Sequence, residues 1–200
     1  LFLILPKKNM LKDLVLKNRS YRRIIEKDTI SQKLLKECID LARNAPSAAN
    51  KQSLKYIIVI NPDIREKVFE TLSWAGYLKN WDGPPVGERP SGYIIMLNDT
   101  SVSTNYFCDH GIAAQTILLG ASEKGYGGCI IASVDKTKLR NNLQISEKLE
   151  IIQVLAMGKP KEEIKLEPIG NDGDIKYWRD KNEVHHVPKR NLEDIIIETK

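Results

Sequence analysis

Cysteine and histidine are scarce in this sequence, and neither occurs at the spacing of a metal site. The three cysteines, Cys38, Cys108 and Cys129, form no C-x-x-C pair, which excludes zinc ribbons and iron–sulfur clusters. Their apolar neighbours predict three buried thiols in a reducing compartment. The pair His185–His186 is explained as well by a solvated strand edge as by ligation. We therefore expect no metal.

Long apolar runs are also missing. The longest, such as Leu1–Leu5 and Ile57–Ile60, fall far below the roughly 20 residues that a membrane helix needs. Leu1–Leu5 is too short for a signal peptide and follows no basic segment. With 42% apolar and 28% charged residues, the composition is that of an ordinary globular chain. We expect a soluble cytoplasmic protein without membrane contact, with an N-terminal extension at residues 1–9 and a single domain at residues 10–200.

Motifs for nucleotide phosphates and for nucleophilic hydrolysis are missing as well. The chain has no P-loop, and Gly125–Gly128 lies between an expected helix and an expected strand, the reverse of the dinucleotide-binding order. We interpret this glycine segment as a helix C-cap followed by a tight turn. No G-x-S-x-G segment supports a serine nucleophile.

The apolar pattern predicts a chain that mixes helices and strands. Two helices precede the first strand, which argues against a doubly wound fold and favours α+β, with helices packed on a central mixed or antiparallel sheet. A proline-rich stretch at residues 76–92 is expected to be irregular. The expected helices cover residues 10–18, 31–45, 62–72, 106–124 and 135–143, and the expected strands cover residues 56–60, 93–97, 129–134 and 151–157.

Positive charge is concentrated near the start of the chain. The net charge is only +5, but seven basic residues between Lys7 and Arg23 stand against one acid, Asp13. Nucleic acid would suit this charge, yet neither interleaved aromatic residues nor a recognition motif accompanies it, so we expect no nucleic-acid partner. A small anionic ligand and a solvated basic surface remain as explanations.

The segment from Asn18 to Arg22 carries the residue types that a phosphate monoester needs. Arg19 and Arg22 are three residues apart, so a helical turn would place both guanidinium groups on one face, next to the Ser20 hydroxyl. Each guanidinium can donate two aligned N–H bonds to a phosphate. A solvated basic face explains the segment equally well when it is considered alone.

Two further segments are ambiguous in isolation. Residues 45–52 combine small residues with the polar side chains of Ser47, Asn50 and Gln52, which suits either a helix-terminating loop or a close approach to a flat ligand. Near the end of the chain, Lys189 and Arg190 form a second basic pair that could close on the same anion or lie at the surface.

Taken in order, these segments resemble the FMN-dependent nitroreductase family. The resemblance extends from about Met10 to Asp194, and no single motif carries it. It depends on five segments in series: Arg19–Arg22, Pro46–Gln52, Gly83–Pro90, Asp109–Leu119 continuing to Gly125–Cys129, and the terminal basic pair.

The resemblance implies a nitroreductase-like fold in an intertwined homodimer, and it implies a role for each matched residue. The family pattern has K-x-R at its end, whereas this chain has adjacent Lys-Arg, so which of the two binds phosphate stays open. The implied FMN contacts are Arg19, Ser20 and Arg22 at the phosphate and ribityl chain, Pro46, Ser47, Ala48 and Asn50 from the opposite subunit, Ala132 and Ser133 beside flavin N5, and Lys189 and Arg190 at the phosphate.

The resemblance also implies the chemistry. NADH or NADPH would pass a hydride to flavin N5 and leave, and a small-molecule electron acceptor such as a nitro compound or quinone would then take two electrons in a ping-pong cycle. The protein would supply position and electrostatics, with no catalytic side chain. Trp81 would either stack on substrate or fill the core. The alternatives are a non-catalytic flavin-binding protein and a relative acting as a reductive dehalogenase or flavin-cleaving enzyme.

The end of the chain gives independent support for a dimer. The run Ile195–Ile197 is more apolar than a free terminus should be. We expect the last ten residues to lie on a partner subunit.

Overall fold

A four-stranded antiparallel sheet forms the centre of the fold. The computed structural model describes residues 10–200; the expected extension at residues 1–9 lies outside the described part. The strands are β1 (Leu54–Val59), β2 (Gly92–Asp99), β3 (Gly127–Ile131) and β4 (Leu149–Gly158), in the order β1-β2-β4-β3. The predicted α+β class, with helices on an antiparallel sheet, is confirmed.

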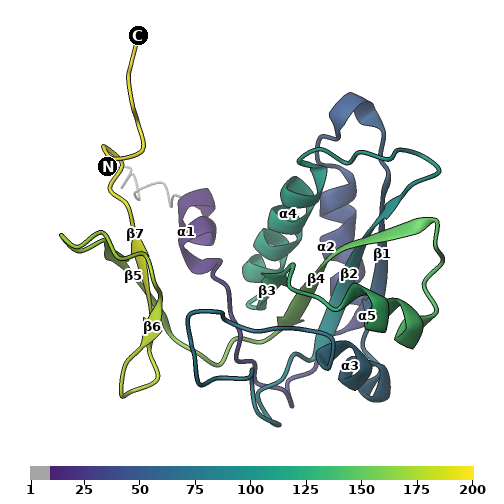
Figure 1. Cartoon of the computed structure of the whole chain (residues 1–200), viewed down its shortest axis with the longest axis horizontal. Coiled ribbons are helices and arrows are strands. Elements are labelled where there is room, and N and C mark those ends of the chain that lie inside the picture. The colour runs from purple at the N-terminus through teal and green to yellow at the C-terminus, as the bar shows by residue number, and fades with distance from the viewer. Residues whose placement is uncertain (1–9) are drawn as a thin grey trace, which may run out of the picture.

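Helices cover both faces of this sheet (Figure 1). Strand β2 shows why, because its alternate side chains enter two separate cores. Ile94 and Met96 pack with α2 (Gln32–Arg43) and α4 (Asp109–Glu123), whereas Tyr93 and Ile95 pack on the opposite side with Val68 of α3 (Pro62–Phe69) and Leu139 of α5 (Lys136–Leu143).

Local sequence signals set the helix starts. Ser31 caps α2 by accepting a hydrogen bond from the Leu34 N–H, as its sequence position predicts. Asn61 caps α3, and Pro62 occupies the first turn, where a missing N–H costs nothing. Helix α4 begins at Asp109, three residues later than predicted.

The chain also forms a second sheet, which its sequence pattern does not predict. Strands β5 (Ile164–Pro168), β7 (His185–Lys189) and β6 (Trp178–Arg179) form a small mixed sheet in that order. In Figure 1 it stands to one side of the main sheet, with α1 (Met10–Lys17) between the two and the C-terminal tail extending beyond β7. This sheet brings the end of the chain near its beginning.

The segment after α1 docks along β3 in an extended conformation. Ser20 forms a parallel bridge with Gly128, and the Tyr21 N–H donates to the Gly128 carbonyl at 3.0 Å. A Cβ at Gly128 would lie 2.3 Å from the Ala156 carbonyl oxygen, so glycine permits this close packing. The predicted helical turn through Arg19 and Arg22 is therefore wrong, because tertiary hydrogen bonds to β3 replace local helical ones.

One other expectation is also wrong. Cys108 is exposed because it precedes the first turn of α4 rather than lying on its packed face; Cys38 and Cys129 are buried as predicted. His185 and His186 are buried rather than solvated, because β7 is the central strand of the small sheet and not an edge.

Within the described residues, no helix is both long and apolar enough to cross a bilayer.

Candidate functional site

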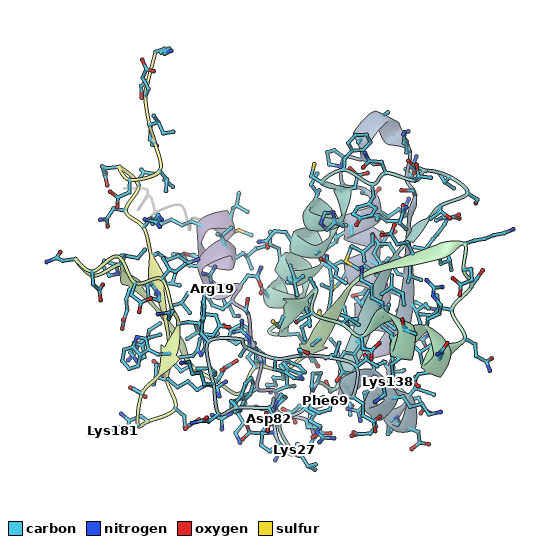
Figure 2. The ribbon with its side chains drawn as sticks, in the orientation of Figure 1. Arg19, Lys27, Phe69, Asp82, Lys138 and Lys181 are labelled. Carbon is cyan, nitrogen blue, oxygen red and sulfur yellow. The ribbon has the colours of Figure 1, made fainter. Side chains whose placement is uncertain are left out.

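A cavity of about 350 Å³ lies where the two ends of the chain meet, and we call it the cation cavity. Arg19, Ser20 and Arg22 line it from the segment after α1, and Lys189 lines it from β7. Figure 2 labels Arg19 just beyond the end of α1. The fold thus brings together four of the predicted site residues that the sequence separates by some 170 positions.

The cation cavity is positive and lacks internal neutralisation. In the part of the chain that the structure describes, no aspartate or glutamate lines it, and none of Arg19, Arg22 and Lys189 has an ion-pair partner. Arg19 donates to the Val15 carbonyl at 2.6 Å, but its buried Nε has no acceptor, and the buried Oδ1 of Asn18 has no donor. Unpaired buried polar atoms beside unneutralised guanidinium groups fit an anionic, hydrogen-bonding ligand.

A buried carboxylate fixes the backbone that carries these arginines. The Glu162 side chain is fully buried and accepts hydrogen bonds from the N–H groups of Arg22 and Arg23, and from Arg179 of β6 at 3.2 Å. The Arg23 side chain turns away from the cation cavity toward Glu88. Arg22 is therefore held at the backbone, and its guanidinium group, which donates to the Ser20 carbonyl at 3.2 Å, borders the cation cavity.

An adjacent cavity of about 180 Å³ contains the predicted residues Ala132 and Ser133. It shares Arg22, Ile130 and Tyr177 with the cation cavity, so the two cavities lie next to each other. Among residues 10–200, neither the Ala132 N–H nor the Ser133 N–H donates a hydrogen bond. These two free backbone N–H groups at the end of β3 could donate hydrogen bonds to a flat polar ring.

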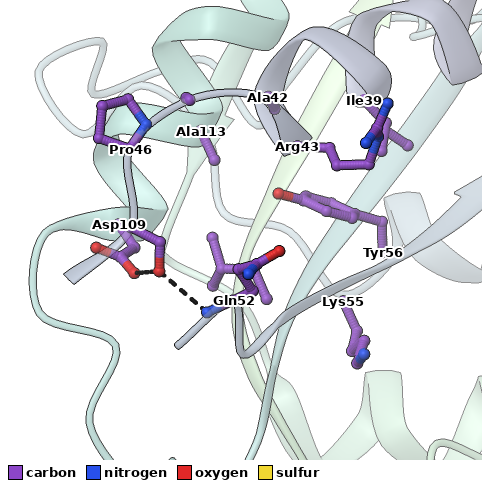
Figure 3. A pocket seen from close by; sticks show the side chains of 12 residues that line it. Ile39, Ala42, Arg43, Pro46, Gln52, Lys55, Tyr56, Asp109 and Ala113 are labelled. Carbon is purple, nitrogen blue, oxygen red and sulfur yellow. Dashed lines mark hydrogen bonds between the residues drawn. The ribbon is translucent and has the colours of Figure 1, made fainter. Parts of the chain in front are cut away.

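The predicted loop Pro46–Asn50 lies elsewhere in the chain. Pro46 and Ser47 line a separate cavity of about 310 Å³, the loop cavity (Figure 3), which shares no lining residue with the cation cavity. Ala48 and Asn50 form the short turn η1 (Ala48–Asn50) that follows. Within one chain, this loop and the basic residues are not brought together.

The loop is held in an unusual conformation. Ala49, Asn50 and Gln52 all have φ near +50°, a region that residues with a Cβ rarely adopt. The buried carboxylate of Asp109 holds the loop by accepting hydrogen bonds from the Ser47 hydroxyl at 2.7 Å and from the Ala48 N–H at 3.0 Å. Backbone strain that is held by a buried partner is typical of binding loops.

The remaining predicted features lie outside these cavities. Arg190 is exposed and does not line the cation cavity, although its neighbour Lys189 does. Trp81 packs edge-on against Trp74 and beneath the Arg179 guanidinium group, which supports the core-filling alternative. The side chains of residues 195–197 are exposed, by 60%, 52% and 100% in turn.

Sequence analysis did not identify four residues that shape the site: Glu162, Asp109, Tyr177 and His185. Glu162 lies in a charged loop, where a buried carboxylate has no sequence signature. The other three do carry a sequence signal: Tyr177 is an aromatic residue in an irregular segment, which needs a packing partner, Asp109 begins the matched segment Asp109–Leu119, and His185 belongs to the His185–His186 pair.

Comparison with known proteins identifies the family. The family model described as Nitroreductase family matches residues 15–81 and 92–159. MhqN of Bacillus subtilis (strain 168), assigned as an NAD(P)H nitroreductase, is 21% identical over 182 residues, covering 75% of this chain and 88% of the relative. A nitroreductase family protein from Clostridium novyi NT is similar in structure, with a TM-score of 0.63, 25% identity, and coverage of 75% of this chain and 84% of that one.

The fold is shared with a further solved structure over nearly the whole chain. The Nitroreductase Family Protein from Streptococcus pneumoniae TIGR4 has a TM-score of 0.66 and 20% identity, covering 95% of this chain and 100% of that one. The match of the family model to more than half of the sequence, together with this common fold, shows that the chain belongs to the nitroreductase family of oxidoreductases.

Proposed function

We propose that this protein is an FMN-dependent oxidoreductase that transfers two electrons from NADH or NADPH to a nitro compound, quinone or similar acceptor. The observation that carries the proposal is the convergence of Arg19, Ser20, Arg22 and Lys189 on one cavity without a carboxylate. A phosphate monoester satisfies such a donor set, because it offers several strong acceptor oxygens and negative charge.

The residues present fit FMN in the following way. Arg19, Ser20 and Lys189 would hold the phosphate, and the free N–H groups of Ala132 and Ser133 would face the ring in the adjacent cavity. When bound, FMN would supply the redox chemistry, accepting a hydride from the nicotinamide and passing two electrons to the acceptor. Arg22, which borders both cavities, would place positive charge near the ring. No side chain is assigned a catalytic proton transfer.

We further propose that the active form is a homodimer. The strained loop Pro46–Asn50 and the cation cavity occupy different places in one chain, so only a second copy could bring such a loop to the ring. The exposed apolar tail, residues 195–197, and the exposed Leu11 and Leu16 of α1 are surfaces that a partner could cover. A mass of one chain in sedimentation experiments at working concentration would contradict the dimer.

A visible spectrum of the purified protein, before and after incubation with FMN, tests the proposed cofactor. We expect a yellow protein whose flavin absorbance bleaches on anaerobic addition of NADH or NADPH and returns on addition of an acceptor. Bleaching without turnover by any acceptor would indicate a different reaction, and FMN binding without bleaching would indicate a non-catalytic flavoprotein. A colourless protein that does not bind micromolar FMN would refute the proposal.

Matched charge variants test the proposed phosphate contacts. Arg19→Ala and Lys189→Ala should each weaken FMN binding about 10- to 100-fold, since a charge-assisted hydrogen bond contributes about 1.5–3 kcal/mol. Lys181→Ala is the control, because Lys181 is exposed at the far tip of the small sheet (Figure 2). Arg190→Ala should resemble this control, since Arg190 lies outside the cavity wall. A loss confined to Arg190→Ala would reverse the assignment of the basic pair.

A further inference from the structure

His185 is a polar side chain that the fold buries without a partner. Its exposed fraction is 0%, and within the described residues neither ring nitrogen makes a hydrogen bond. A neutral imidazole carries one N–H donor and one acceptor, and burying both unpaired destabilises the folded chain. Such a group calls for a specific explanation.

The strand that carries His185 turns it toward the cation cavity. Because side chains alternate along a strand, His185, Val187 and Lys189 share one face, and all three line that cavity. The opposite face carries His186, whose ring bonds to the Glu167 carboxylate. Two neighbouring histidines of one strand therefore differ sharply: the one facing away from the cavity is paired, and the one facing it is not.

His185 lies at the end of the cavity away from the phosphate-binding lysine. His185 and Lys189 are four residue steps apart on β7, a distance of about 13 Å along a strand. Its ring centroid is 5.1 Å from that of Tyr177, and the Arg22 guanidinium group lies 4.9 Å from the same Tyr177 ring. Tyr177 and Arg22 also border the adjacent cavity, so His185 stands near the junction of the two.

The imidazole is neutral in this environment. Burial, together with the positive charges of Arg22, Arg179 and His186, lowers the pKa of His185 to about 4. A neutral imidazole beside two guanidinium groups is better suited to an uncharged oxygen than to a second phosphate contact, since a phosphate dianion would favour a protonated ring.

We propose that His185 is a flavin-binding residue whose ring N–H is reserved for an uncharged oxygen of FMN, on the ribityl chain or the ring, and not for the phosphate. This inference rests on the proposed function. In the flavin-free protein the unpaired ring lowers stability, and in the complex it gains its missing hydrogen bond. His185 therefore lowers the unfolding free energy of the flavin-free protein and raises the affinity for FMN, a combination expected of residues that bind a ligand.

The variant His185→Phe tests whether His185 binds flavin or only supports the fold. Phenylalanine keeps an aromatic ring against Tyr177 and removes both unpaired nitrogens. We expect the flavin-free variant to melt about 2–4 °C higher than the unsubstituted protein. We expect its affinity for FMN and for riboflavin, measured by quenching of flavin fluorescence, to fall about tenfold for each.

Two further variants complete the test. Lys189→Ala should weaken binding of FMN but not of riboflavin, which lacks the phosphate. His185→Gln, which restores an N–H donor, should recover part of the affinity for both flavins; if His185→Phe does not fold, this variant must still bind both flavins within about threefold of the unsubstituted protein. A larger loss would overturn the proposal.

Other outcomes are equally decisive. Unchanged affinity in His185→Phe, with a lower melting temperature, would make His185 structural. A loss for FMN alone would place its contact at the phosphate and contradict the proposal. If the unsubstituted protein binds neither flavin, the proposed function itself fails; if it binds FMN and His185→Phe binds equally well, only the assignment of His185 fails.

Discussion

Glu162 offers the most direct test of how the site is built. Its buried carboxylate joins three parts of the chain: the N–H groups of Arg22 and Arg23 after α1, its own segment after β4, and the Arg179 side chain of β6. Glu162→Ala would leave these donors without their acceptor. The exposed fraction of the Arg179 side chain is only 11%, so its charge would remain buried and unpaired.

The size of the effect follows from this burial. Removing one partner of a buried ion pair costs about 3–5 kcal/mol of unfolding free energy. For a chain of this length, that corresponds to a melting temperature about 6–20 °C lower. FMN affinity should fall as well, because Glu162 fixes the backbone that presents Arg22 to the cation cavity. Thermal and urea unfolding, followed by a flavin titration on folded protein, measure both effects.

The neighbouring residue supplies the control. The Glu163 side chain is exposed and pairs with the exposed Lys165, so Glu163→Ala should change the unfolding free energy by less than about 1 kcal/mol. Equal and small losses for Glu162→Ala and Glu163→Ala would refute the claim that a buried carboxylate organises the arginine segment. If Glu162→Ala lowers the unfolding free energy as expected but leaves the FMN affinity of the folded protein unchanged, the proposed link between Glu162 and the site is refuted.

Two further predictions concern stability. The Glu167 carboxylate raises the pKa of His186, so this pair stabilises the fold below the ordinary histidine pKa of about 6.5, and the contribution is lost as pH rises through the raised value. The unfolding free energy, measured in urea at pH 6, 7 and 8, should decline with pH, and His186→Gln should reduce this decline. If the variant shows the same pH dependence as the unsubstituted protein, the prediction is contradicted. Gly128→Ala should cost about 1–3 kcal/mol, because its Cβ would lie 2.3 Å from the Ala156 carbonyl oxygen, whereas Gly111→Ala in α4 meets nothing within 4 Å and should stabilise; equal effects in urea unfolding would show that the packing at β3 is not tight.

The main sheet and its helices could be predicted because their signals are local. Strand β2 is a continuous apolar run, and Ser31 and Asn61 cap helices at the positions where their side chains can accept backbone N–H groups. The small sheet could not be predicted in the same way. Strand β5 is charged and partly exposed, β6 has two residues, and β7 contains Pro188, which cannot donate a ladder hydrogen bond.

The site shows the same division between local and distant causes. The residue types of Arg19, Ser20 and Arg22 indicated an anion, and these residues do line one cavity. The predicted reason, a helical turn, was wrong, since the bridge to Gly128 holds the segment extended. This segment meets Lys189 in one cavity although some 170 positions separate Arg19 from Lys189, a contact that no sequence window contains.

The location of the cation cavity links ligand binding to the assembly of the fold. Its charged residues come from the segment after α1 and from β7, and both lie outside the four-stranded sheet. Arg19, Arg22 and Lys189 repel one another when no anion is present, which opposes the docking of these two segments on each other. An anion bound by Arg19 and Lys189 would offset this repulsion and stabilise only the assembled form. The proposed ligand would therefore help to hold the two ends of the chain together, and its removal should loosen the small sheet before it affects β1–β4.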